Sequence, residues 1–316
     1  MFESIWDDIR NNFRSGSMLT RIIMVNVTVF LVILLASIFV KGFAGQGGYN
    51  TFLQFFMMSD DWLHNLTHPW VFFSYMFLHE SFWHLFWNMV VLYWFGNIVG
   101  DFLGDRVVLP TYLLSGLAGA FIYFFVANLP IPWMIGGYML GASAAVNGFM
   151  MLAASKFPDY EVRLILLGPV RIKYVVAVFI IIDLIAISEN SNTGGHLAHI
   201  GGAAMGWFIV YLWDNQNVDL IGRTNGILDN IANFFKGLVG EKSKQGSTVR
   251  VDYQPPQSKP KKQRSARSQK STPPPTQSGQ SHQDKLDGIL DKIKVSGYEN
   301  LTAEEKDFLY NASKKD

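Results

Sequence analysis

Long apolar stretches constrain this chain more than any other feature of its sequence. A helix needs roughly 20 mostly apolar residues to cross about 30 Å of hydrocarbon, and six stretches of the 316-residue chain reach or approach that length. They are Thr20–Val40, Phe82–Val99, Val108–Ala127, Gly141–Ser155, Tyr174–Ser188 and Leu197–Trp213. The sequence therefore predicts an all-α membrane protein with a six-helix transmembrane bundle over residues 20–213.

Composition supports this class and excludes others. Charged residues are 16% of the chain, against roughly 25% in ordinary soluble proteins. The absence of Cys rules out disulfides, thiolate metal sites and a Cys nucleophile. The net charge of +1 gives no support for a nucleic-acid partner, so we expect the lipid bilayer and other membrane proteins as partners.

The positions of Lys and Arg predict the orientation. Only Lys41 falls on one side of the predicted bundle, and the remaining basic residues near the stretches fall on the other. These are Arg10, Arg14, Arg21, Arg106, Lys156, Arg163, Arg171, Lys173 and the basic tail. Because Lys and Arg are enriched in cytoplasmic loops, both termini are predicted to be cytoplasmic, and we expect a multi-pass protein of a bacterial inner membrane.

The segments outside the bundle have distinct compositions. Residues 1–19 form a cytoplasmic N-terminal segment, and an aromatic-rich loop is predicted from Gly42 to Glu80. Residues 214–243 are typical of an amphipathic juxtamembrane helix on the inner leaflet, and equally of a helix that packs on the rest of the protein. Residues 244–283 are typical of a disordered basic linker rich in Pro and Ser. Residues 284–316 predict a small helical hairpin with a Thr302–Glu305 capping box, which we expect to bind a cytoplasmic partner.

Ser143 is a candidate nucleophile. It follows Gly141 at the start of the fourth stretch, after the glycines Gly136 and Gly137. Backbone N–H groups at a helix start are free to bind a developing negative charge. A serine that only links helices by a hydrogen bond is the alternative interpretation.

His199 is the candidate base for that serine. It lies in the motif AHIGG of the sixth stretch, and small residues surround both His199 and Ser143. Small residues let two membrane helices approach closely, so the hydroxyl and the imidazole can come within hydrogen-bond reach, which activates a weak nucleophile. The alternative is a histidine that satisfies a core hydrogen bond, and His196, three residues earlier, receives a secondary role at most.

His84 and Asn88 are candidate oxyanion donors. They lie four residues apart in HESFWHLFWN, which begins at His79, so both project from one face of the second stretch. A histidine and an amide can donate to the oxyanion of acyl transfer. Zinc bound by His79, His84, His196 and His199 is the alternative, but the HExxH motif and a nearby acidic ligand are missing. We therefore predict no metal and no cofactor.

Together, these motifs in this order resemble the rhomboid family of intramembrane serine proteases, from about Trp70 to Trp213. The resemblance implies a rhomboid-like six-helix fold and a Ser–His dyad without a third acid. It matches Ser143 to the nucleophile and His199 to the base. The supporting residues of the two motifs are then Gly141, Ala198 and Gly202.

The resemblance also implies roles for the second stretch. His84 and Asn88 match the side chains of the oxyanion hole, which the backbone N–H of Ser143 completes, and His79 matches a histidine that steadies the first loop. Three positions depart from the family pattern. Asn147 replaces a frequent aromatic residue under the histidine, Val71 a frequent Arg, and Ala144 a common glycine.

The implied activity is an intramembrane serine endopeptidase acting on transmembrane protein substrates. Two other classes remain open. A transporter using the intramembrane His and Asn is disfavoured because charged residues are nearly absent from the stretches, with Asp183 as the clear exception. A catalytically silent rhomboid-like protein that binds membrane clients is disfavoured because Ser143 and His199 are both present.

Overall fold

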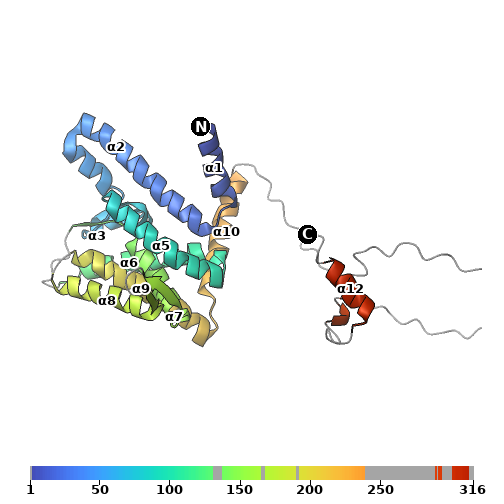
Figure 1. Ribbon diagram of the computed structural model, residues 1–316. Coiled ribbons are helices and arrows are strands. Elements are labelled where there is room, and N and C mark those ends of the chain that lie inside the picture. The colour runs from blue at the N-terminus through green and yellow to red at the C-terminus, as the bar shows by residue number, and fades with distance from the viewer. Residues whose placement is uncertain are drawn as a thin grey trace, which may run out of the picture. The chain divides into compact units, whose positions relative to one another are not determined.

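The computed structural model describes residues 2–130, 137–164, 168–189, 192–238, 289, 291–293 and 301–312. It divides into two compact units, Met1–Gly246 and Ser247–Asp316. Helices dominate the larger unit (Figure 1), so the predicted all-α class is confirmed. The linker predicted over residues 244–283 lies outside the described residues.

Each predicted stretch coincides with a helix of the larger unit, except that Gly141 and Ala142 of the fourth stretch precede the helix. Its helices are α1 (Phe2–Ser15), α2 (Met18–Gln54), α3 (Trp62–Thr67), α4 (Val71–Ser74), α5 (Phe82–Leu103), α6 (Val108–Ala127), α7 (Ser143–Lys156), α8 (Ile172–Ser188), α9 (Thr193–Gln216) and α10 (Leu220–Leu238). Among the described helices, two are long and apolar enough to cross a membrane by that criterion alone, Met18–Gln54 and Asp105–Ala127. That all six stretches cross it stays a prediction.

The long loop predicted from Gly42 to Glu80 is wrong in its first part, because α2 continues to Gln54. Only Gly45 leaves helical geometry, at φ +67° and ψ −173°. Glycine has no Cβ and adopts positive φ at little cost, so the chain kinks there and resumes the helix. The following segment forms α3, α4 and the strand β1 (Met58–Ser59), which pairs antiparallel with β2 (Tyr138–Met139).

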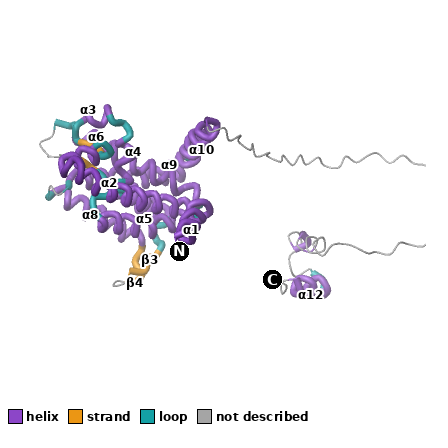
Figure 2. Tube along the Cα trace, turned by 90° about the horizontal axis from the view of Figure 1, so that it is seen from above, coloured by secondary structure: helices purple, strands orange, loops and turns teal. Residues whose placement is uncertain are grey.

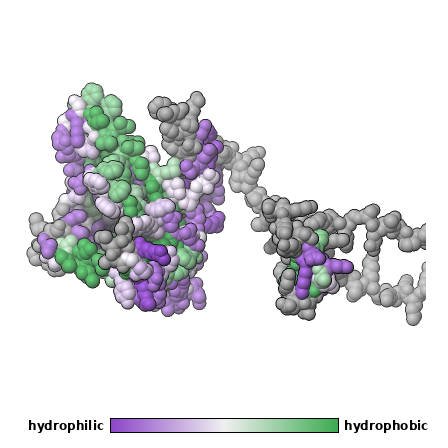
Figure 3. Space-filling view, in the orientation of Figure 1, coloured by the Kyte–Doolittle hydropathy of each residue, from purple (hydrophilic) through white to green (hydrophobic). Residues whose placement is uncertain are grey.

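The outward faces of α2 and α8 are apolar. On α2, Ile38 and Phe39 are each 64% exposed, and on α8 Ile181 and Leu184 are each 54% exposed. Figure 3 shows hydrophobic residues running along α2. Soluble proteins rarely expose continuous apolar surface of this extent, so these faces match helices that contact lipid.

Charged residues gather at the end of the larger unit where α7 stops. Lys156, the last residue of α7, forms an ion pair with Asp214, and Asp159 binds Lys173 at 2.7 Å. The β-hairpin of β3 (Glu161–Leu164) and β4 (Gly168–Arg171) projects from the helices near this end (Figure 2). These basic residues are among those that predict the cytoplasmic side.

Helix α10 follows this end and is amphipathic, as the sequence predicts. Ile221 is buried, and the Asn225 amide donates to the carbonyl of Arg106 at 3.0 Å. Farther along the helix, Phe234 and Phe235 are 65% and 59% exposed. Contact of this exposed part with the inner leaflet stays a prediction.

Helix α7 is enclosed by its neighbours, with ten of its 14 residues buried. Small residues permit this packing. A Cβ added to Gly202 of α9 would overlap the carbonyl oxygen of Ala144, and one added to Gly206 would overlap that of Gly148. On α6, a Cβ at Gly119 would lie 2.5 Å from the Cβ of Ala144. The predicted close approach of α7 and α9 through small residues is confirmed.

Replacing Gly202 with alanine should therefore destabilise the bundle by about 1–3 kcal/mol, as overpacking does in other cores. The added methyl group meets backbone, which cannot rotate away as a side chain can. Thermal unfolding of the purified protein in detergent measures the effect. Gly100→Ala on α5 is the matched control, because its methyl group meets Val108 at an ordinary 3.6 Å. Equal melting temperatures for the two variants would contradict the packing argument.

In the smaller unit, α12 (Ala303–Ala312) starts with the predicted capping box. The Thr302 N–H donates to Glu305 Oε2 at 2.8 Å, and the Glu305 N–H donates to Thr302 Oγ1 at 3.3 Å. Lys292 also binds this carboxylate, at 2.8 Å. The capping box is confirmed, whereas much of the predicted hairpin, including Leu286, lies outside the described residues.

The capping box should make the order of α12 depend on pH. The bonds from Lys292 and then Thr302 hold the pKa of Glu305 below its usual range. A lowered acid pKa stabilises the fold above the unfolded value of about 4.3 and stops doing so as pH falls through the folded pKa. We expect amide protection of α12 to fall below about pH 4. Hydrogen exchange of the full chain, corrected for its intrinsic pH dependence, measures this.

Glu305→Gln should weaken that pH dependence, and Glu304→Gln, at the preceding residue, is the matched control. The effect is small, because the Glu305 carboxylate is partly exposed to solvent and salt screens its pairing. The same pH dependence in both variants would contradict this assignment.

Candidate active site

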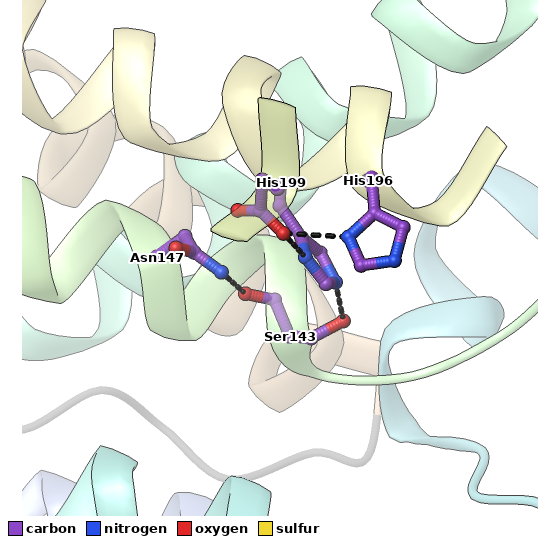
Figure 4. A network of polar contacts seen from close by, with 5 residues as sticks. Ser143, Asn147, His196 and His199 are labelled. Carbon is purple, nitrogen blue, oxygen red and sulfur yellow. Dashed lines mark hydrogen bonds and ion pairs between the residues drawn. The ribbon is translucent and has the colours of Figure 1, made fainter. Parts of the chain in front are cut away.

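Ser143 and His199 meet where α7 packs against α9. Ser143 is the first residue of α7, and His199 lies in the second turn of α9. Ser143 Oγ is 2.7 Å from His199 Nε2, and Figure 4 draws this contact as a dashed line. The structure brings the two residues into hydrogen-bond contact, which is the geometry required for a base to activate a serine.

The chain before Ser143 is shaped by Gly141. Its φ of +131° is unfavourable for residues that carry a Cβ, and an added Cβ would lie 2.9 Å from His84 Nε2. The Gly141 N–H donates to the Tyr75 carbonyl at 2.9 Å, which anchors this turn. Ser143 then starts a helix whose first N–H groups have no intrahelical partner. Position 141 therefore requires glycine for two reasons, its positive φ and the closeness of His84.

His84 and Asn88 face the same cavity as the serine. The Ser81 hydroxyl accepts a hydrogen bond from the His84 N–H at 3.2 Å and caps the start of α5. One turn later, the Asn88 amide donates to the His84 carbonyl at 2.8 Å. The cavity has a volume of about 600 Å³. Its lining includes His84, Asn88, Gly141, Ser143, Ala198 and His199.

His79 lies behind this cavity and is 6% exposed. Its ring packs edge-on against His84, with the ring centroids 5.1 Å apart. Neither ring nitrogen of His79 has a hydrogen-bond partner among the described residues. The contact supports the side chain of His84, while a role in holding the loop stays a prediction.

Asn147, which replaces an expected aromatic residue, bonds within its own helix. Its amide donates to the Ser143 carbonyl at 3.0 Å, one turn back along α7 (Figure 4). It forms no hydrogen bond to His199 among the described residues. The orientation of His199 is therefore fixed from another direction.

That direction is Asp183 on α8, which sequence reasoning did not include in the site. Asp183 is 5% exposed, and its Oδ1 lies 2.8 Å from His199 Nδ1 and 2.6 Å from His196 Nδ1. The arrangement differs from the dyad without a third acid that the resemblance implies. The available signal was the high cost of an acid in an apolar stretch.

The same cluster places an acidic side chain beside two histidines, which the sequence analysis did not expect. The sequence offered no acidic residue close to His196 and His199, yet ligand atoms of Asp183 and both histidines lie within 4.8 Å of one another. Histidine and carboxylate are ligands that zinc accepts. In the structure these atoms hydrogen-bond to each other, so a chelator is needed in any functional test.

Comparison with known proteins identifies the domain that holds this site. Residues 66–215 match the family model of the Rhomboid domain. The chain therefore contains the domain that defines the rhomboid family. This family is membrane-embedded and includes serine proteases as well as inactive members, so the rhomboid chain is a membrane protein.

Similar rhomboid proteins occur in plants, yeast and mammals. RHOMBOID-like protein 12, mitochondrial, of Arabidopsis thaliana is 33% identical over 41% of this chain and 42% of its own length. Rhomboid protein 1, mitochondrial, of Saccharomyces cerevisiae is 30% identical over 43% and 39%. The human presenilin-associated rhomboid-like protein, mitochondrial, is 26% identical over 44% and 38%. The match thus spans about two fifths of these relatives, and their names describe them as mitochondrial.

Proposed function

We propose that this rhomboid chain is an intramembrane serine endopeptidase that cuts peptide bonds in or near transmembrane segments of other proteins. The observation that carries the proposal is the 2.7 Å contact between Ser143 Oγ and His199 Nε2. Both side chains open into a cavity lined by two further polar groups, His84 and Asn88. A nucleophile, a base and oxyanion donors are the groups that acyl transfer requires.

The proposed reaction follows from these positions. Neutral His199 accepts the hydroxyl proton at Nε2 while Ser143 Oγ attacks the scissile carbonyl carbon. The oxyanion is held by the Ser143 N–H, His84 and Asn88, whose amide keeps a second N–H after donating to the His84 carbonyl. His199 then protonates the leaving amine, and water hydrolyses the acyl-enzyme in a second cycle.

The depth of Ser143 supports cleavage inside the membrane. Ser143 and Lys156 are the two ends of α7, so at 1.5 Å per residue they lie about 20 Å apart. If the charged end of α7 is at the cytoplasmic surface, Ser143 lies about 10 Å below the opposite surface of a 30 Å hydrocarbon layer. The cavity then has to admit water from that side, and a substrate helix has to unwind locally to be cut.

We propose that the chain crosses its membrane several times and that both termini lie on the cytoplasmic side. The expectation of a bacterial inner membrane finds no support in the relatives, whose names describe mitochondrial proteins. Transmembrane proteins in the same bilayer are the proposed substrates. We also propose that residues 284–316 bind a cytoplasmic partner.

The test is cleavage of a single-span reporter by the purified full chain in liposomes, together with labelling by a fluorophosphonate probe. We expect cleavage, an adduct that peptide mapping finds on Ser143, and no effect of a chelator. Heat-unfolded protein is the control for labelling. Folded protein that neither cuts several reporters nor reacts with the probe would refute the protease and favour a silent, client-binding member. Loss of cleavage on chelation would favour a metal at Asp183, His196 and His199.

A further inference from the structure

The buried acid on α8 has a function that the proposed dyad does not use. Asp183 is the only acidic residue in α8, and it is 5% exposed in a helix that is otherwise almost wholly apolar. A charged group in this setting is costly unless other groups pair with it. Its partners are two histidines of α9, bound through one oxygen atom at 2.8 and 2.6 Å.

The contact with His199 fixes which ring nitrogen carries the proton. A neutral imidazole has one N–H and one acceptor nitrogen. Nε2 faces the Ser143 hydroxyl and must be the acceptor if it is to take that proton. Nδ1 must then carry the hydrogen, and this N–H donates a hydrogen bond to the Asp183 carboxylate. Without an acceptor at Nδ1, the opposite tautomer would point its N–H at the serine and could not act as a base.

The Asp183 carboxylate also stabilises the positive charge that forms on His199 during the reaction. When Ser143 gives its proton to Nε2, His199 becomes a cation. Asp183 lies 2.8 Å from that ring on the side away from the serine, where the low dielectric of the interior strengthens the attraction. The proton stays on His199 until the leaving amine takes it, and Asp183 itself is never protonated.

His196 acts on the same acid from the neighbouring turn. It lies three residues before His199, so both rings project from one face of α9, and their centroids are 5.3 Å apart. Its Nδ1 bonds to the Asp183 oxygen that His199 also uses. A second donor satisfies the buried carboxylate and limits its rotation. Besides His199, the titratable residues that line the cavity are Tyr75, Glu80, His84 and Tyr138.

We infer that Asp183 is a positioning residue that completes a Ser143–His199–Asp183 triad, with His196 holding the acid in place. The inference rests on the proposed serine protease function. An aromatic residue at position 147 would support the His199 ring by packing. In this chain a hydrogen bond from Asp183 on a third helix, α8, supports it instead.

The test compares Asp183→Asn, which keeps the shape, and Asp183→Leu, which suits an apolar helix, with wild type in the full chain. We expect wild-type melting and a KM within about threefold, but a kcat lower by about 10²-fold or more, as for the acid of soluble triads. Ser188→Ala at the end of α8 is the matched control and should leave kcat unchanged. A folded Asp183→Asn protein with kcat within about threefold of wild type would overturn the triad.

The role of His196 has its own variant. His196→Phe should lower kcat by about tenfold in the wild-type background and not at all in the Asp183→Asn background, because it acts through that acid. An equal loss in both backgrounds would show that His196 acts independently of Asp183 and would overturn this part of the inference.

A spectroscopic readout separates the triad from the protease. Nitrogen-15 NMR of histidine-labelled full chain, assigned with His196→Phe and His199→Gln, reports the tautomer of each ring. We expect the Nδ1–H tautomer for His199 in wild type and its loss in Asp183→Leu. The Nε2–H tautomer in wild type would overturn the inference even if the protein cuts reporters. The expected tautomer in a protein that cuts nothing would support the hydrogen bond and refute only the protease.

Discussion

Changing Ser143 to alanine is expected to reduce kcat for a single-span reporter by on the order of 10⁶-fold, the scale seen when a soluble serine protease loses its nucleophile. The substitution removes one oxygen atom, the one that lies 2.7 Å from His199 Nε2. The helix itself should be unaffected, because alanine is a good helix former. Reporter cleavage and probe labelling by the purified variant in liposomes measure the loss.

Ser115→Ala is the matched control for this variant. Ser115 is a buried serine of α6, and its hydroxyl has no hydrogen-bond partner among the described residues. The control removes the same atom from the same bundle without touching the cavity, so activity should stay at the wild-type level. The double variant Ser143→Ala/His199→Ala should be no slower than the single one, because the pair works as a unit. Residual cleavage by Ser143→Ala within tenfold of wild type would mean that another group is the nucleophile.

Changing Asn88 to alanine should lower kcat by about 10²–10³-fold with little change in KM, the effect of removing one oxyanion donor elsewhere. The Asn88 side chain lines the cavity beside Ser143, and its free N–H should bond strongly only to the charged oxygen of the transition state. An interaction made only in the transition state changes kcat rather than substrate binding. Initial rates over a range of reporter concentrations separate the two constants.

Asn97→Ala on the same helix is a close control for that measurement. The Asn97 amide donates to the carbonyl of Tyr93 at 2.8 Å, the same distance and spacing as the bond from Asn88 to His84. Asn97 lies outside the cavity lining, so its removal repeats the local change in the helix without the loss of a donor. Similar losses in the two variants would show that Asn88 supports the helix and does not stabilise the oxyanion.

The sequence by itself determined the helices and the chemical identity of the reacting pair. Apolar runs predicted the stretches inside α2 and α5 to α9, because length and hydropathy are local properties. The small residues around Ser143 and His199 predicted a close helix contact, and Gly202 packs on Ala144 as that pattern requires. The capping box at Thr302 was readable for the same reason, since its two residues lie within one turn.

Only the tertiary structure decided what surrounds His199. Asp183 lies 16 residues away on another helix, and its contact depends on how α8 and α9 rotate and shift against each other. Hydrophobic periodicity carries little of that information in helices that are apolar on every side. The continuation of α2 past Gly45 and the pairing of β1 with β2 were likewise missed. The Asp183 contact and the β1–β2 pairing each join segments whose relative register no local pattern fixes. The helix past Gly45 was missed for a local reason, because glycine is a poor helix former and its presence favoured a loop. The acid of this site is visible in sequence only as a costly charge in an apolar helix.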